Sequence, residues 1–313
     1  MRTTGPVRQV GNISCNLCGG TDCIPAFGTI ETPVVRCRHC GLVFTGRRPE
    51  FREIVASRYN REYFEAEYLP QLVRDKETSD VERGEYLRTV EKGLPHLGNE
   101  RPRLLDVGSG AGFLLEQART RAWEVQGLEV SEAAASYCQA RLSIPVVVGE
   151  LRRGLFADQS FHAVTMLDVI EHLPDPLSTL KIVVSILKEG CPLLIVTPNF
   201  GSVCRYLLGL EAYGIWPDEH LYYFTSATLR KLLQAAGFRK IWIASRDIYP
   251  QNLSAIMTNL RVTRKIPNSI ARPPDQLKER FYRSKTLRQL RRLGNRVLAR
   301  VHWGDKLVTL AHK

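Results

Sequence analysis

The sequence has no apolar stretch long enough to cross a bilayer. Its longest aliphatic runs, such as residues 192–196, fall far below the ~20 residues that a membrane-spanning helix needs. Nor does a charged segment followed by an apolar one, as in a secretion signal, stand near residue 1. The 313 residues are 44% hydrophobic and 24% charged, an ordinary balance that argues against extensive disorder. We therefore expect a cytoplasmic globular protein with one large core and a small accessory domain.

Acidic residues are scarce in one segment only. Residues 261–306 contain 14 Lys and Arg against three Asp and Glu, so most of the net charge of +12 lies there. A basic surface over the whole molecule would favour nucleic acid as a partner. Because the rest of the chain is nearly neutral, the charge argues for one local basic patch and against nucleic acid.

Cysteine is concentrated near residue 1, where five of the eight cysteines fall within the first forty residues. Without a secretion signal, this clustering favours a metal site over disulfides. Two Cys-x2-Cys pairs, 18 residues apart and each followed by glycine, are typical of a zinc ribbon. Four thiolates leave no position for water, so the predicted zinc is structural. The predicted ligands are Cys15, Cys18, Cys37 and Cys40; Cys23 and His39 are interpreted as bystanders.

The stretch 104–113 predicts a buried strand that ends in a glycine loop and opens a helix. Gly108, Gly110 and Gly112 lack the β-carbons that would keep a ligand from the backbone. Asp106 lies in the same stretch, and Glu129 follows 23 residues later at the end of the next apolar strand, close to the spacing of acids that meet ribose hydroxyls. The pattern favours a nucleotide-like ligand over a simple tight turn.

Asp106-x-Gly108-x-Gly110-x-Gly112 resembles the first motif of the class I S-adenosylmethionine-dependent methyltransferases. The resemblance implies that S-adenosylmethionine is the cofactor, with Asp106 at its amino group. An acid in the loop argues against NAD, whose pyrophosphate prefers free N–H groups. The resemblance also implies that the cofactor contacts Glu129, at the ribose, Glu150, at the adenine amino group, and Asp168, after the fourth strand.

From Arg101 onward, predicted strands alternate with helices, which indicates an α/β doubly wound, Rossmann-like sheet. Ligands bind such sheets at the carboxyl ends of the strands. The resemblance implies an antiparallel last strand at 305–311 beside the sixth strand at 240–245. We accordingly expect four parts, with the last an insertion between neighbouring strands: a zinc ribbon at 1–50, a helical lid at 51–100, the methyltransferase domain at 101–249 and 302–313, and a basic helical insertion at 250–301.

Two histidines are candidate catalytic residues. His172, in the stretch 166–176, lies where the small-molecule branch of the family is similar to this chain; the Asn/Asp-Pro-Pro-aromatic signature of enzymes acting on base nitrogens is missing. This histidine either acts on substrate or caps a helix. Glu219-His220 is similar to the pair in sugar C-methyltransferases with a four-cysteine zinc domain, which implies that His220 is the base. The alternative is that His220 caps a turn.

The segment 277–301 predicts an amphipathic basic helix, because apolar residues recur at helical spacing with arginines between them. Its apolar residues are Leu287, Leu290, Leu293, Val297 and Val301. One hypothesis is a solvated helix that covers the core. The other is docking on an anionic membrane or an acidic partner.

Together these motifs predict an enzyme that transfers a methyl group from S-adenosylmethionine to a small molecule, such as a sugar or a polysaccharide or natural-product precursor. One alternative is an O-methyltransferase of quinone biosynthesis. Another is an RNA-binding protein or RNA methyltransferase that uses the ribbon and the basic helix as grips.

Overall fold

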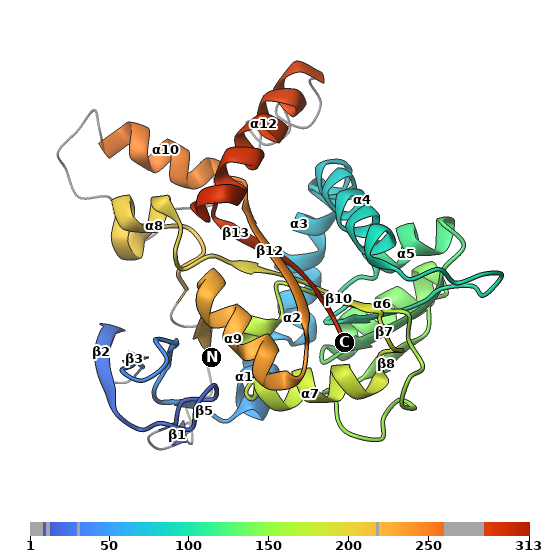
Figure 1. Cartoon of the computed structure of the whole chain (residues 1–313), viewed down its shortest axis with the longest axis horizontal. Coiled ribbons are helices and arrows are strands. Elements are labelled where there is room, and N and C mark those ends of the chain that lie inside the picture. Colours follow the sequence, from blue (N-terminus) through green and yellow to red (C-terminus); the bar gives the residue numbers. More distant parts are fainter. Residues whose placement is uncertain (1–8, 11–12, 30–31, 217–218, 260–284) are drawn as a thin grey trace.

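The computed structural model describes residues 9–10, 13–29, 32–216, 219–259 and 285–313 (Figure 1). Its centre is a seven-stranded sheet in the order β12-β13-β10-β9-β6-β7-β8. The strands are β6 (Arg103–Val107), β7 (Glu124–Glu129), β8 (Val146–Val148), β9 (Ala163–Leu167), β10 (Pro192–Pro198), β12 (Lys240–Arg246) and β13 (Lys306–His312). Only β13 runs antiparallel to its neighbours, β10 and β12. The predicted α/β fold with an antiparallel last strand is confirmed.

Helices cover both faces of this sheet because adjacent strand residues point to opposite sides. Leu104 packs in a core with α4 (Lys76–Gly93), α5 (Phe113–Thr120) and α6 (Glu132–Leu142). Leu105 belongs to the core on the other face, with α7 (Pro176–Ile186) and α9 (Ser226–Ala236). The apolar runs of the strands are therefore buried on both sides, as expected for a parallel sheet.

Local sequence signals fix the ends of the helices on the second face. Asp175 caps α7 by accepting from the backbone N–H of Ser178, and Pro176 occupies the first turn. Thr225 caps α9 in a reciprocal capping box with Thr228. Gly237 ends α9 with φ of 112°, a left-handed conformation that glycine adopts without strain.

The amino-terminal residues form a second sheet in the order β11-β4-β3-β2. It contains β2 (Cys23–Gly28), β3 (Pro33–Cys37), β4 (Val43–Thr45) and β11 (Tyr222–Tyr223), while β1 (Gln9–Val10) pairs separately with β5 (Arg48–Pro49). β11 follows His220, in the chain segment that connects β10 to β12 of the large sheet. A connection of the large sheet therefore supplies one strand of the small sheet. Cys15, Cys37 and Phe44 also lie in the same apolar core as α7 and α9, so the two units pack as one body.

A helical segment leads from the small sheet to the large one. It consists of α1 (Phe51–Arg58), α2 (Arg61–Tyr63), the π-helix η1 (Phe64–Tyr68), α3 (Leu69–Arg74) and α4. Figure 1 shows α8 (Val203–Leu208), α10 (Pro250–Asn259) and α12 (Lys285–Val301) grouped at the upper end of the molecule, with α12 projecting from it. Of the helices in the described ranges, none combines the length and apolarity needed to cross a bilayer.

The helix α12 overturns the hypothesis that its apolar side covers the core. Leu290, Leu293 and Val297 are more than half exposed, and Val301 is 42% exposed. The polar side packs inward instead, because Asn295 hydrogen-bonds the backbone N–H and the carboxylate of Asp247. The side chain of Leu287 and residues 277–284 lie outside the described part of the chain.

Candidate active site

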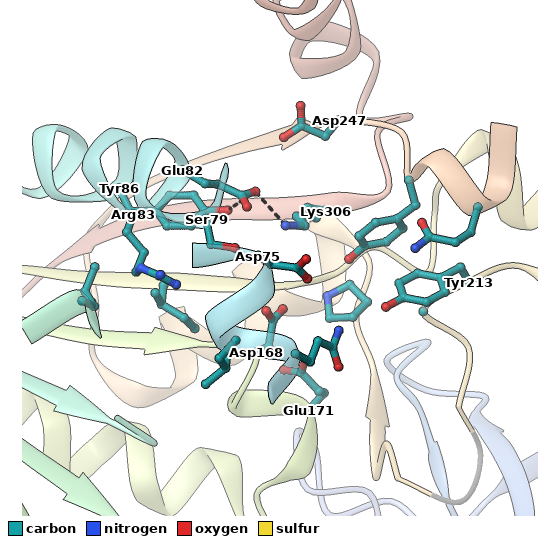
Figure 2. A pocket seen from close by; sticks show the side chains of 18 of the residues that line it. Asp75, Ser79, Glu82, Arg83, Tyr86, Asp168, Glu171, Tyr213, Asp247 and Lys306 are labelled. Carbon is teal, nitrogen blue, oxygen red and sulfur yellow. Dashed lines mark hydrogen bonds and ion pairs between the residues drawn. The ribbon is translucent and has the colours of Figure 1, made fainter. Parts of the chain in front are cut away.

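A cavity of about 1000 Å³ lies beyond the carboxyl ends of the central strands, where the fold predicts a ligand. Residues from the end of β6, the segment after β9, the roof helices α3 and α4, and α12 line it. Figure 2 shows Ser79, Glu82 and Tyr86 projecting from a helix above the cavity, with Asp168 and Glu171 on the opposite side.

The predicted glycine loop follows β6 and lies in a backbone conformation that favours glycine. Gly108, Gly110 and Gly112 all have positive φ values, of 72°, 52° and 80°. A β-carbon on Gly108 would lie 2.4 Å from a methyl group of Val169, and one on Gly110 would lie 3.0 Å from the hydroxyl of Tyr68. A side chain at Gly108 would therefore clash with Val169; of the three glycines, Gly108 lines the cavity.

Asp106 is a buried carboxyl group that lines the cavity. Its Oδ1 accepts a hydrogen bond of 2.6 Å from Thr165. Burial raises the pKa of Asp106 to about 7; the Thr165 hydrogen bond and Arg83 lower it, and nearby Glu129 raises it. A carboxyl group poised in this way suits the positively charged amino group of a ligand.

Glu129 and Glu150 do not line the cavity. The Glu129 carboxylate accepts hydrogen bonds from the backbone N–H groups of Gly110 and Ser131, at 2.8 and 2.9 Å. Burial raises its pKa, although these N–H donors lower it. Tyr68, from η1, stands over the glycine loop beside it. Glu150 is exposed on the surface after β8.

Two histidines meet at the inner end of the cavity. His172 comes from the 3-10 helix η2 (Ile170–His172) after β9, and His220 comes from the turn before β11; their ring centroids lie 4.9 Å apart. One nitrogen of each ring and a carboxylate oxygen of Glu171 lie within 4.8 Å of one another. Asp168, which has φ of 53°, lines the same end. The structure thus brings together residues that are about 50 positions apart in the sequence.

Burial keeps both imidazoles neutral near pH 7. It lowers the pKa of His172 to about 4, against the opposing hydrogen bond to the backbone of Glu219. It lowers the pKa of His220 to about 3, and the neighbouring His172 contributes to this shift. Each ring therefore carries one nitrogen lone pair that can accept a proton or bind a cation, rather than a titrating charge.

The carboxylate of Glu219 contacts Arg58 and not His220, with which the sequence pairs it. Residues 219–220 form an irregular turn, in which both backbone N–H groups donate to the carbonyl of Trp216. Glu219 forms an ion pair of 3.2 Å with Arg58, whereas Glu171 is the carboxylate grouped with His220. The sequence signal for Glu171 is its place directly before His172.

The comparisons with known proteins agree with this geometry. A family model described as a methyltransferase domain matches residues 80–242, which is more than half of the chain. The chain belongs to this methyltransferase family. A solved structure of an S-adenosylmethionine-dependent methyltransferase from Archaeoglobus fulgidus shares its fold at 19% identity, with a TM-score of 0.50 over 78% of this chain and 99% of that one.

Further relatives of this methyltransferase differ in what they act on. Phosphoethanolamine N-methyltransferase 2 of Haemonchus contortus, solved with S-adenosyl-L-methionine, is 15% identical, with a TM-score of 0.50 over 87% of this chain and 62% of that one. The ubiquinone biosynthesis O-methyltransferase of Alkalilimnicola ehrlichii is 33% identical over 33% of this chain and 44% of that protein. That of Ruegeria pomeroyi is 30% identical over 46% and 64%. In the first of these curated relatives, the match spans less than half of the protein's length.

A cluster of charged residues lies at the roof of the cavity of this methyltransferase, and the sequence did not predict it. The Lys306 ammonium donates to Glu82 at 2.7 Å, and Glu82 also accepts from the hydroxyl of Tyr86 (Figure 2). Burial is the largest single effect and lowers the pKa of Lys306, but Glu82, Tyr86, Tyr249 and Asp168 together outweigh it, so the pKa is raised. Nearby, Glu85 accepts from Arg246 and Arg291. No motif could reveal this cluster, because its members come from four separate elements.

The four predicted zinc ligands form a second site away from the cavity. The sulfur atoms of Cys15, Cys18, Cys37 and Cys40 lie within 4.8 Å of one another, with closest pairs of 3.4 and 3.5 Å. Backbone N–H groups of the following residues donate to the sulfurs of Cys15, Cys37 and Cys40. A tetrahedral ion with bonds of ~2.3 Å holds its sulfurs roughly 3.8 Å apart, so these thiols suit zinc.

Proposed function

We propose that this methyltransferase acts on a small molecule, a sugar or a polysaccharide or natural-product precursor, whose attacking atom carries a proton. The observation that carries the proposal is that a residue of the glycine loop and two neutral histidines line one cavity. Aromatic rings of Tyr213, Trp216 and Tyr249 line the acceptor side. Such rings offer flat apolar faces for a sugar ring.

The residues of the loop would hold S-adenosylmethionine, which supplies an electrophilic methyl carbon when bound. In this proposal Asp106 binds the amino group of the cofactor, and the glycines let the cofactor approach the backbone. Asp168 contacts the cofactor from the segment after β9. Glu129 would bind the ribose, and Tyr68 must then move away from Gly110. Glu150, being exposed, would cover only the outer edge of the adenine.

The chain's own contribution to the reaction is position and proton transfer. His220 is fixed by its backbone, because its carbonyl accepts from Thr45 Oγ1 at 3.1 Å and the next N–H donates to the Glu171 carbonyl. His220 takes the proton of the attacking atom, and His172 orients the acceptor. Glu219 acts through its neighbours, since its backbone carbonyl accepts a 3.0 Å hydrogen bond from His172.

A second candidate acceptor is a quinol, because the curated relatives are ubiquinone biosynthesis O-methyltransferases. The test is mass spectrometry of the products after incubation with isotope-labelled cofactor and a panel of nucleotide sugars, quinols and RNA. We expect labelled methyl on a sugar. Label on a quinol selects the second candidate, and label on RNA alone contradicts both.

We also propose that the four-cysteine cluster holds one structural zinc ion. All four ligand positions are filled by thiols, so the ion would supply no reacting group. Its role is to stabilise the small sheet, whose own core is too small to fold independently.

A further inference from the structure

The inner end of the cavity contains a second group of metal-ligating side chains besides the cysteines. Glu171, His172 and His220 each offer one ligand atom, and these atoms lie within 4.8 Å of one another. All three residues line the cavity. Glu171 and His172 come from η2, and His220 comes from the turn before β11.

One carboxylate oxygen of Glu171 has no hydrogen-bond partner among the described residues. Glu171 is 1% exposed; its Oε2 accepts a 2.9 Å hydrogen bond from Thr197, while Oε1 is buried without a hydrogen-bond partner among the described residues. Leaving a buried carboxylate oxygen unpaired is unfavourable, because the oxygen loses the hydrogen bonds that water would supply. Such an oxygen calls for a cation or a proton.

The imidazoles are oriented as metal ligands usually are. Nδ1 of His172 lies 3.0 Å from the carbonyl oxygen of Glu219; because a carbonyl only accepts, Nδ1 carries the hydrogen and Nε2 keeps its lone pair. His220 similarly forms a backbone hydrogen bond with Gly214. Metal-binding histidines typically donate their second N–H to a backbone carbonyl or carboxylate, which fixes the ring and its tautomer.

We infer that Glu171, His172 and His220 bind a divalent transition-metal ion of the zinc type at the inner end of the cavity. Two imidazoles and one carboxylate suit Zn²⁺ and similar ions, whereas Mg²⁺ and Ca²⁺ prefer oxygen ligands throughout. Three protein ligands leave a coordination position open toward the cavity. Bonds of ~2.0 Å hold tetrahedral ligands roughly 3.3 Å apart, so small side-chain rotations would close the site.

The inference deepens the proposed function and rests on it for one consequence only. An acceptor hydroxyl that occupies the open position loses its proton more readily, as metal-bound water does. With the ion bound, His220 would be one of its ligands instead of the proton acceptor proposed above, and His220→Ala would lower turnover in either case. Metal binding itself needs neither an acceptor nor methyl transfer. An experiment can therefore disprove the metal site without disproving the proposed function, and the reverse.

The experiment counts metal ions in the full-length protein by mass spectrometry after loading with Zn²⁺ and removal of unbound ion. We expect one more zinc per chain in the unsubstituted protein than in Glu171→Gln or His220→Asn. Glu219→Gln is the matched control, because it changes an adjacent carboxylate outside the cluster and should keep the extra ion. Retained S-adenosylmethionine binding shows that each variant is folded.

A Co²⁺ titration gives a second readout, since cobalt bound by nitrogen and oxygen absorbs differently from cobalt bound by thiolates. The Glu171→Gln change should weaken the nitrogen-and-oxygen site by on the order of 100-fold or more, beyond the 10- to 100-fold cost of changing a residue behind the ligands. Equal zinc counts in the unsubstituted protein and both variants, with no such cobalt band, would overturn the inference. Glu171 would then hold a proton, and the proposed function would stand unchanged.

Discussion

At the scale of single residues, burial decides the chemistry of the site. Asp106 and His220 are ordinary titratable residues in the sequence, but the fold places both where a charge is poorly solvated. The pKa of the acid rises to about 7 and that of the histidine falls to about 3. Near pH 7 the histidine is therefore neutral, while Asp106 stands at the midpoint of its titration.

The first prediction concerns Asp106 and the pH dependence of cofactor binding. Because burial raises its pKa to about 7 despite Thr165 and Arg83, Asp106 holds a proton below that pH and must lose it to meet an ammonium group. The affinity for S-adenosylmethionine should fall about tenfold per pH unit below pH 7 and level off just above it. Calorimetry in buffers of different ionisation enthalpy measures both the affinity and the released proton.

Thr165→Val supplies the control for this prediction. It removes the hydrogen bond that lowers the pKa of Asp106, so the inflection should move to higher pH. Asp106→Ala should abolish binding. An affinity that does not change between pH 5.5 and 7.5 would contradict the role of Asp106.

The second prediction concerns His220. His220→Ala should lower turnover by ~10²–10⁴-fold, the usual effect of removing a general base, and leave the cofactor affinity nearly unchanged. His172→Ala should cost less, because that ring orients the acceptor. Steady-state kinetics with the identified acceptor, alongside cofactor calorimetry, measures both. Full turnover by His220→Ala would leave positioning alone to explain the rate.

At the scale of secondary-structure elements, α12 presents a face that nothing in the described chain covers. Its stripe of Leu290, Leu293, Val297 and Val301 is exposed, and the flanking residues Arg292, Arg296 and Arg300 are exposed too. Its other side is tied to the body through Arg291, 2.7 Å from Glu85. An apolar stripe flanked by arginines is typical of helices that lie on anionic membrane surfaces.

The third prediction is that α12 binds anionic vesicles. The protein should sediment with vesicles containing phosphatidylglycerol, and the bound fraction should fall as salt screens the arginines. Replacing Leu290, Leu293 and Val297 by serine should release it, because the apolar contacts are lost. Replacing the exposed Leu210 of η3 (Gly209–Glu211) by serine is the control. Equal binding to neutral and anionic vesicles would rule out this surface role.

At the scale of the whole molecule, the small sheet that carries the cysteines is hydrogen-bonded directly to the segment that contains His220. β11 pairs with β4, and the backbone N–H of Thr45 donates to the carbonyl of Leu221 at 2.9 Å. The residue that precedes Leu221 is His220. A change in the small sheet must therefore reach the proposed base.

The fourth prediction follows from this link. Cys37→Ser should remove one zinc ion per chain, lower the melting temperature, and reduce turnover more than cofactor affinity, because the glycine loop lies on the other sheet. Elemental analysis, calorimetry and kinetics measure these effects. Cys23→Ser is the matched control, since Cys23 lies opposite Cys37 in the β2–β3 pair and should leave all three unchanged. A folded, chelator-resistant protein without metal would contradict the proposal.

The sequence by itself determined the elements that depend on local chemistry. The closely spaced glycines at 108–112, cap residues such as Thr225 and Gly237, and apolar residues such as Leu104, Leu105 and Val107 predict the loop, the helix ends and the strands, because neighbouring residues alone dictate them. The Cys-x2-Cys pairs likewise predict the sulfur cluster. In each case the signal lies within a few residues of the structure it produces.

Only the tertiary structure decided the contacts between distant segments. It paired Glu219 with Arg58, grouped Glu171 with His220, and turned the apolar side of α12 outward. It also joined β11 to the cysteine sheet. These outcomes depend on which surfaces meet when seven strands and their helices pack together. A local sequence pattern does not specify contacts between residues that are far apart in the chain.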